Sequence, residues 1–171
     1  YNFSKGSSYK LEVEYKWEGR FPAIQIGMHA PDQFDLMQEA VDTAKDADAV
    51  ILIVGTNSDW ETEGNDRLSL ALPSNQDELV QKICSANNNT VVVLNTGSPC
   101  EMPWIDEANS ILQCWFPGQE FGNSLSDILF GSVNPSGKLP TTFPKKLSDT
   151  PAYSTYPGKD LQMDYEEGLF I

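Results

Sequence analysis

The sequence is poor in basic residues, with 11 Lys and Arg against 25 Asp and Glu, which gives a formal net charge of −14 at pH 7. Nucleic acids and anionic membrane surfaces would both repel such a chain, because they carry the same sign of charge. Long apolar runs are also lacking. The longest, residues 49–54 and 110–116, fall far short of the roughly 20 residues that span a bilayer. No basic-then-apolar signal segment opens the sequence. We therefore expect a soluble chain that binds neither nucleic acid nor membrane.

Cysteine and histidine are scarce. The cysteines, Cys84, Cys100 and Cys114, form no C-x-x-C pair, which argues against a zinc site or a disulfide framework and favours buried free thiols. The single histidine, His29, precedes Ser124, which stands in an incomplete G-x-S-x-G motif without its last glycine. No Ser-His-Asp arrangement is predicted, and we interpret His29 as an ordinary linker residue.

Phosphate-binding motifs are missing as well. Neither G-x-G-x-x-G nor G-x-x-x-x-G-K-[ST] occurs, so dinucleotide binding is set aside and no cofactor is expected. Apolar residues, in contrast, are plentiful, since 40% of the 171 residues are hydrophobic. A chain of this length corresponds to about one domain and buries a core without disulfide or metal staples. We therefore expect it to fold.

The N-terminal segment has a period of two. Apolar residues alternate with charged ones at positions 9–15, which is typical of a half-buried antiparallel strand, and residues 21–26 predict a second strand. Because two strands alone are marginally stable, this segment is predicted to be the end of a β domain. The predicted boundary lies near residues 29–31.

From Asp32 onward, helical periods and apolar runs alternate. The predicted helical stretches are residues 37–47, 79–84, 102–108 and 121–129. The predicted strands are residues 50–54, 90–94 and 111–116. Asp32 and Ser74 are candidate N-caps of the first two helices. Strands that are unbroken hydrophobic runs are buried on both faces, so the sequence predicts an α/β fold with an open, mostly parallel sheet flanked by helices. The segment from Lys145 is predicted to be an extended tail.

Chemistry is expected in the loop after the first strand, because ligands of open α/β sheets bind beyond the carboxyl ends of the strands. This acidic loop, residues 59–67, holds four carboxylates, one arginine and an indole. Like-charge repulsion can raise the pKa of one carboxyl group while arginine keeps another ionised, as a general acid beside an ion pair requires. A solvated acidic loop is the plainer alternative.

A calcium site is a second alternative for the acidic loop. Asp59, Glu61 and Glu63 imitate the first positions of an EF-hand, but Leu70 stands where a bidentate glutamate belongs. No metal is therefore predicted.

Seven short segments together form a recognisable pattern. They are ILIVG (51–55), ETEGNDR (61–67), LP (72–73), NTGSP (95–99), WFPGQE (115–120), GKLPTTFP (137–144) and YEEGLFI (165–171). In this order they resemble the α/β-sandwich domain of glycoside hydrolase family 3, over residues 31–171. Residues 1–30 resemble the last strands of a PA14 domain, a β module that fungal and yeast β-glucosidases of this family insert into the sandwich.

The resemblance implies a retaining β-glucosidase that hydrolyses terminal non-reducing β-D-glucosyl residues. In this family an aspartate nucleophile from a (β/α) barrel and an acid/base glutamate from the sandwich flank the glycosidic bond. The acid/base usually precedes Gly in Glu-Gly-x-Asp-Arg, which is Glu63 here, and Glu61 is the runner-up. Asp66 and Arg67 are expected to brace the loop through an ion pair. Trp60 and Glu61 are candidate substrate-binding residues, although Trp60 is expected to pack the loop instead.

Half of an active site is expected, because this sequence contains no barrel, and the isolated chain is therefore predicted to be inactive. The alternative is a non-catalytic carbohydrate-binding or interaction module with the same fold. The partners implied are a β-glucoside or oligosaccharide substrate and the barrel of the same enzyme. The resemblance also suggests cellulose and polysaccharide degradation and a secreted protein with acceptors for N-glycosylation at Asn2 and Asn88, with a cytoplasmic location as the alternative.

Overall fold

The computed structural model describes residues 4, 6–16, 24, 26, 35–166, 168 and 169. The chain divides into two compact units, Tyr1–Gln33 and Phe34–Ile171. His29, Asp32, the predicted boundary at 29–31 and most of the predicted strand at 21–26 lie outside the described residues. The assignment of residues 1–30 to a PA14 domain stays a prediction.

The predicted strand at 9–15 is wrong, because residues 6–16 form neither a helix nor a strand. Leu11 and Val13 are 74% and 46% exposed, so their alternation with charged residues does not mark a half-buried face. A period of two specifies only how side chains alternate, whereas a strand also needs a hydrogen-bonded ladder with a second strand.

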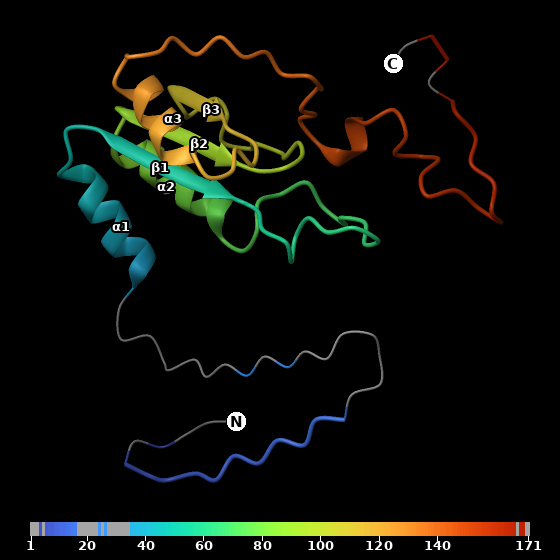
Figure 1. Cartoon of the computed structure of the whole chain (residues 1–171), viewed down its shortest axis with the longest axis horizontal. Helices are drawn as coiled ribbons and strands as arrows, with labels where there is room; N and C mark the ends of the chain where they lie inside the picture. Colours follow the sequence, from blue (N-terminus) through green and yellow to red (C-terminus); the bar gives the residue numbers. More distant parts are fainter. Residues whose placement is uncertain are drawn as a thin grey trace. The chain divides into compact units, whose positions relative to one another are not determined.

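A three-stranded parallel sheet forms the centre of the second unit (Figure 1). Its strands are β1 (Val50–Gly55), β2 (Thr90–Asn95) and β3 (Ser110–Gln113), in the order β1-β2-β3. The predicted parallel α/β sheet is confirmed, although β3 ends three residues before the predicted limit. The last residue of β1, Gly55, pairs with the last residue of β2, Asn95. The carboxyl ends of the strands therefore meet at one edge of the sheet.

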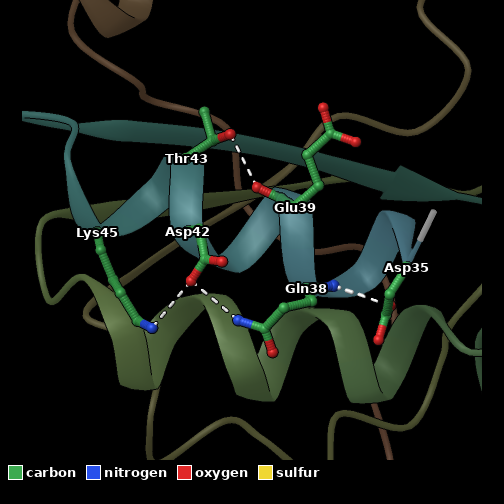
Figure 2. Close-up of polar contacts among 6 residues, drawn as sticks. All are labelled: Asp35, Gln38, Glu39, Asp42, Thr43 and Lys45. Carbon is green, nitrogen blue, oxygen red and sulfur yellow. Dashed lines mark hydrogen bonds and ion pairs between the residues drawn. The ribbon is translucent and has the colours of Figure 1, made fainter.

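Helix α1 (Leu36–Lys45) begins at a capped N-terminus (Figure 2). The carboxylate of Asp35 accepts a hydrogen bond from the backbone N–H of Gln38 at 3.0 Å. Asp35 therefore takes the N-cap position that we predicted for Asp32. Both aspartates precede the periodic stretch, but only Asp35 stands directly before the first helical residue, where a side-chain oxygen reaches an unpaired N–H.

Helix α2 (Gln76–Ala86) follows β1 and packs against α1. Val41 and Ala44 of α1 form a buried cluster with Ile83 of α2, and Val50 and Leu52 of β1 pack against this cluster. The predicted N-cap of α2, Ser74, is wrong. Asn75 takes that position, because Ser74 lies in the preceding turn with a φ of 56°.

Helix α3 (Phe121–Leu129) is confirmed, but the predicted helix at 102–108 is wrong. The residues there form turns closed by hydrogen bonds from Ile105 N–H to Met102 O and from Glu107 N–H to Trp104 O, each 3.0 Å long. Trp104 is fully buried, and its indole N–H donates to Asp77 Oδ1 at 2.8 Å. The segment is thus held by the buried Trp104 ring and its hydrogen bond to Asp77, and it does not form a helix.

The main core lies between the sheet and α2. Its buried residues are Val54, Leu72, Val80, Cys84, Val92, Leu94, Cys100 and Trp104. All three cysteines are free, and the expectation of buried thiols is confirmed for Cys84 and Cys100, whereas Cys114 is half-buried. Burial raises the pKa of the Cys100 thiol to about 11, so this sulfur is protonated at neutral pH.

Strand β1 was expected to be buried on both faces, but one of its faces is half exposed. Ile51 and Ile53 are each about half exposed, whereas Val54 is buried. This strand is at the edge of the sheet, and within the described residues it pairs only with β2. Within the described part of the chain, no helix is both long and apolar enough to cross a membrane.

The C-terminal segment is less extended than predicted. It contains a short 3₁₀ helix, η1 (Leu147–Asp149), and further turns at residues 151–157. Phe143 packs against the main core and contacts the ring of Trp115 edge-on, with 5.9 Å between the ring centroids. The backbone N–H of Leu147 donates to Glu101 Oε1 at 2.6 Å. These contacts attach the beginning of the tail to the α/β unit.

Candidate active site

The acidic loop starts at a rigid strand end. Gly55 donates its N–H to Gln76 Oε1 at 2.7 Å and accepts a hydrogen bond from Gln76 Nε2 at 2.9 Å. A Cβ atom on Gly55 would lie 2.1 Å from the carbonyl oxygen of Asn95, so only glycine fits between the two strands. The chain then runs beyond the carboxyl edge of the sheet, as Figure 1 shows. This is the edge where a ligand site was predicted.

A tight turn brings the acidic loop back toward β1. The backbone N–H groups of Trp60 and Glu61 both donate to the carbonyl oxygen of Asn57, at 3.0 and 2.8 Å. The side chain of Asn57 accepts from Asp59 N–H at 3.0 Å. Because of this turn, the carboxylate of Glu61 reaches Thr56, the first residue after β1.

The carboxylate of Glu61 accepts three hydrogen bonds from two different loops. Its Oε1 accepts from the hydroxyl of Thr56 and from the backbone N–H of Gly97 at 3.1 Å. Its Oε2 accepts from the hydroxyl of Ser98 at 2.7 Å. Partial burial alone would raise the pKa of Glu61, but these hydrogen bonds and the charge of Arg67 outweigh it and lower the pKa. Glu61 is therefore an ionised acceptor.

Arg67 is also fixed to the loop after β2. Its Nη1 donates to Ser98 Oγ at 2.7 Å and to the carbonyl oxygen of Pro99 at 3.2 Å. The expected ion pair between Asp66 and Arg67 is wrong, since none joins these two described residues. The carboxylate of Asp66 instead lies beside the Tyr156 hydroxyl and raises the pKa of that hydroxyl. Adjacent residues of an extended backbone point to opposite sides, so sequence neighbours need not form a pair.

Glu63 lies at the exposed tip of the acidic loop. Thr62 and Asn65 form an antiparallel bridge, which leaves Glu63 and Gly64 as the two central residues of a tight turn. Gly64 has a φ of 81°, the left-handed conformation that a type II turn requires at its third position. No hydrogen bond within the described part of the chain involves the Glu63 carboxylate, in contrast to that of Glu61.

The inner side of the acidic loop encloses a pocket with a volume of about 240 Å³. Its lining residues are Asp59, Trp60, Thr62, Asn65, Asp66, Arg67, Leu68 and Ser69. Trp60 is half-buried, and its indole nitrogen has no hydrogen-bond partner within the described residues. Both the packing of the loop by Trp60 and its contact with a sugar stay predictions.

The acidic residues do not converge on a cation. Among the described residues, no group of three or more His, Cys, Asp or Glu side chains is placed to hold a metal ion. The EF-hand-like spacing of Asp59, Glu61 and Glu63 therefore has no counterpart in the geometry, because Glu61 is held by Thr56 and Ser98 while Glu63 is exposed.

Sequence reasoning missed the residues that bind Glu61. Thr56, Gly97 and Ser98 contribute its hydrogen bonds, and Gly97 and Ser98 lie 36 and 37 residues away along the chain. One signal was available, because the NTGSP segment follows the second predicted strand and must therefore reach the same sheet edge as the acidic loop.

We predict that Glu61→Gln destabilises the chain in a pH-dependent way. At pH 7 the variant should lose about 1–2 kcal/mol of unfolding free energy, because hydrogen bonds to an ionised group are replaced by weaker ones. The pKa of Glu61 is lower in the folded state than the usual value of 4.5 for a glutamate side chain. Its stabilising effect is thus fully present above pH values near 4.5 and is lost as the pH falls through the folded pKa. Urea unfolding at pH 7 and in acid measures this difference.

Glu78→Gln is the matched control for that measurement. Glu78 is an exposed carboxylate on α2 whose Oε1 lies 2.7 Å from Lys82 Nζ. Exposed helical pairs contribute only about 0.3–0.5 kcal/mol, so its substitution should have a small effect at either pH. A Glu61→Gln loss that stays constant from neutral to acidic pH would contradict the assignment of Glu61 as an ionised acceptor.

Comparison with known families and proteins agrees with the fold. Residues 8–171 match the model of the glycosyl hydrolase family 3 C-terminal domain. A β-glucosidase from Rhizobium radiobacter is 46% identical over 173 residues, covering 95% of this chain and 21% of that protein. A putative β-glucosidase from Schizosaccharomyces pombe is 52% identical over 181 residues, covering 98% of this chain and 22% of that protein.

A solved β-glucosidase structure is also similar to this chain in fold and sequence. The crystal structure of a β-glucosidase from Kluyveromyces marxianus in complex with glucose superposes with a TM-score of 0.78 at 40% identity. The match covers 84% of this chain and 17% of that one. The chain thus spans about a fifth of the length of the curated relatives that it matches. With its parallel α/β sheet and a family match over nearly all of its residues, the chain belongs to the glycosyl hydrolase family 3 C-terminal domain family.

Proposed function

We propose that this chain is the part of a retaining β-glucosidase that supplies the acid/base glutamate, Glu63. The remainder of the site, including the nucleophile, would come from a (β/α) barrel of the same enzyme, and the substrate would be a terminal β-D-glucosyl residue. Relatives that are β-glucosidases and about five times longer than this chain support the proposal.

The observation that carries this proposal is the exposure of Glu63 at the tip of a loop beyond the carboxyl edge of the sheet. An acid/base must reach the glycosidic oxygen and must exchange its proton during the reaction. An exposed carboxylate on a turn that projects from the domain meets both requirements. Glu61 meets neither, because its two oxygens are occupied by Thr56, Gly97 and Ser98.

A site shared between two domains agrees with retaining chemistry. The two carboxyl groups of a retaining enzyme stand about 5–5.5 Å apart on opposite sides of the anomeric carbon. A projecting loop can place Glu63 at that distance from a nucleophile on a neighbouring domain. Asp66 and Arg67 would then support the loop through Tyr156 and Ser98, rather than contact the sugar.

Product stereochemistry tests the retaining mechanism. We predict that the full-length enzyme first releases β-glucose from nitrophenyl β-glucoside, because two successive displacements preserve the configuration. Proton NMR during the first minutes of the reaction distinguishes this anomer from α-glucose, before mutarotation mixes the two. Initial release of α-glucose would overturn the retaining assignment, and failure of the full-length protein to hydrolyse any β-glucoside would favour the binding-module alternative.

Further features stay predictions from the sequence. These are secretion, cellulose degradation and N-glycosylation. Asn88, one of the two glycosylation acceptors, is exposed just before β2, which would leave room for a glycan. The other acceptor, Asn2, lies outside the described residues.

A further inference from the structure

We propose that Glu61 is a positioning residue, whose carboxylate fastens the acidic loop to Thr56 directly after β1 and to the loop after β2, and thereby sets where Glu63 stands. The inference rests on the proposed function of Glu63. It replaces the two roles that the sequence suggested for Glu61, acid/base and substrate binding.

The hydrogen bonds of the Glu61 carboxylate with Thr56, Gly97 and Ser98 hold separate chain segments together, and we call this arrangement the clamp. The carboxylate joins three chain segments, because it accepts from Thr56 after β1 and from Gly97 and Ser98 after β2 while its own backbone belongs to the acidic loop. Charge-assisted hydrogen bonds are roughly twice as strong as neutral ones. This side chain thus helps to bind the loop that carries Glu63 to the carboxyl edge of the sheet.

The hydroxyl of Ser98 fixes both sides of the turn that carries Glu63. It donates to Glu61 Oε2 at 2.7 Å and accepts from Arg67 Nη1 at 2.7 Å. Glu61 directly precedes the bridged turn of residues 62–65, and Arg67 follows it after one residue. The two ends of the turn therefore converge on one atom, which limits how far its tip can move.

The Glu61 carboxylate lies close to the backbone of Gly97, where there is room only for a glycine. A Cβ atom on Gly97 would lie 2.9 Å from Glu61 Oε2 and 2.6 Å from a ring carbon of Phe116. Both distances are shorter than a normal van der Waals contact, so any larger residue would push the carboxylate or the aromatic ring away. The close approach of the Gly97 backbone to Glu61 is therefore part of the arrangement.

The same contacts argue against a direct chemical role for Glu61. A general acid needs a proton on its carboxyl group, whereas donors from three residues favour the ionised form. A substrate hydroxyl would have to compete with these donors for the same two oxygens. Glu61 is thus expected to act through Glu63, two residues away.

The expected effect on catalysis follows from how strongly reaction rates depend on the position of a reacting group. A shift of 1 Å in a reacting group can cost about 10²-fold in rate. We expect Glu61→Ala in the full-length enzyme to lower kcat/KM for cellobiose by about 10–100-fold, with kcat affected more than KM, because a displaced acid assists the transition state less.

A double-mutant cycle tests whether Glu61 acts through Glu63. Glu61→Ala, Glu63→Ala and the double variant are compared in the full-length enzyme, with kcat/KM for cellobiose as the readout. If the loss caused by Glu61→Ala disappears in the Glu63→Ala background, the two residues act as one unit. Added azide should not accelerate Glu61→Ala, because its Glu63 carboxylate is still present. Glu78→Ala, an exposed carboxylate paired with Lys82, is the control and should leave kcat/KM unchanged.

The outcomes separate this inference from the proposed function. An equal loss in both backgrounds would mean that Glu61 acts independently of Glu63, which overturns the positioning role and leaves the acid/base assignment intact. A Glu63→Ala enzyme with full activity would overturn the acid/base assignment itself. If Glu61→Ala does not fold, Glu61→Gln and Ser98→Ala enter the same cycle, because each weakens the clamp while keeping most of its volume. A loss of melting temperature with unchanged kcat/KM would show a purely structural role and would also overturn the inference.

Discussion

Replacing Glu63 by alanine in the full-length enzyme is expected to lower kcat/KM for cellobiose by about 10²–10⁴-fold, the usual contribution of general acid–base catalysis. The glucose leaving group of cellobiose is a poor one and needs a proton as the glycosidic bond breaks. Glu63 is exposed and has no described hydrogen-bond partner, so its removal should disturb the fold little. Circular dichroism of the variant would verify that the loss is catalytic.

Activated substrates should behave differently in the same variant. A nitrophenolate leaves without protonation, so the first step should be much less impaired for aryl glucosides than for cellobiose. The second step then lacks its base, and a small anion such as azide should accelerate turnover by replacing the base-assisted water. The measurement compares both substrates with and without azide, and the product with azide should be a β-glucosyl azide, because two successive inversions at the anomeric carbon give net retention.

Glu61→Ala is the matched comparison for this experiment, since it removes the other glutamate of the same loop. The structure accounts for the difference between them, because Glu61 is held by Thr56, Gly97 and Ser98 while Glu63 is exposed at the turn. Azide acceleration of Glu61→Ala together with an unresponsive Glu63→Ala would reverse the two roles.

The strands were predictable because their signal is local and strong. Continuous apolar runs at residues 50–54 and 90–94 predicted β1 and β2 to within one residue. Their parallel arrangement followed from the intervening helical period, since a parallel pair needs a crossover connection. The exposure of Ile51 and Ile53 could not be predicted in this way, because a hydrophobic run does not reveal that a strand is at the edge of the sheet.

The helix errors have specific causes. The segment at 102–108 has helical spacing, but its large residue, Trp104, is drawn into the core and bonded to Asp77, a residue of α2. Tertiary packing of this kind overrides a short local pattern. The N-cap errors are of one to three residues and reflect the presence of more than one polar residue ahead of each periodic stretch.

The sequence predicted which loop holds the candidate site residues, but not the contacts that these residues make. Topology alone directed attention to the loop after β1, and the glutamate-rich sequence there gave the candidates. Which glutamate is bound and which is exposed depends on Gly97 and Ser98, which lie on a different loop. The pairing of Arg67 with Ser98 rather than Asp66 has the same origin. Contacts between distant segments carry no signature in a single sequence.

The isolated 171-residue chain should hydrolyse nitrophenyl β-glucoside no faster than buffer alone. Retaining chemistry needs a second carboxylate about 5–5.5 Å from the acid/base, on the opposite side of the anomeric carbon. The other glutamate of the acidic loop, Glu61, is committed to Thr56, Gly97 and Ser98 and is not available as a nucleophile. Without a nucleophile, no glycosyl-enzyme intermediate forms, so the acid/base has no intermediate whose hydrolysis it could assist by activating water. The assay compares equal molar amounts of the chain and the full-length enzyme, after circular dichroism has verified that the chain is folded.

Glu63→Gln in the isolated chain is the control, since it should change nothing if the background rate is uncatalysed. Clear turnover by the chain that Glu63→Gln abolishes would show that a second carboxylate of this chain acts as the nucleophile, and the site would then not be shared with a barrel.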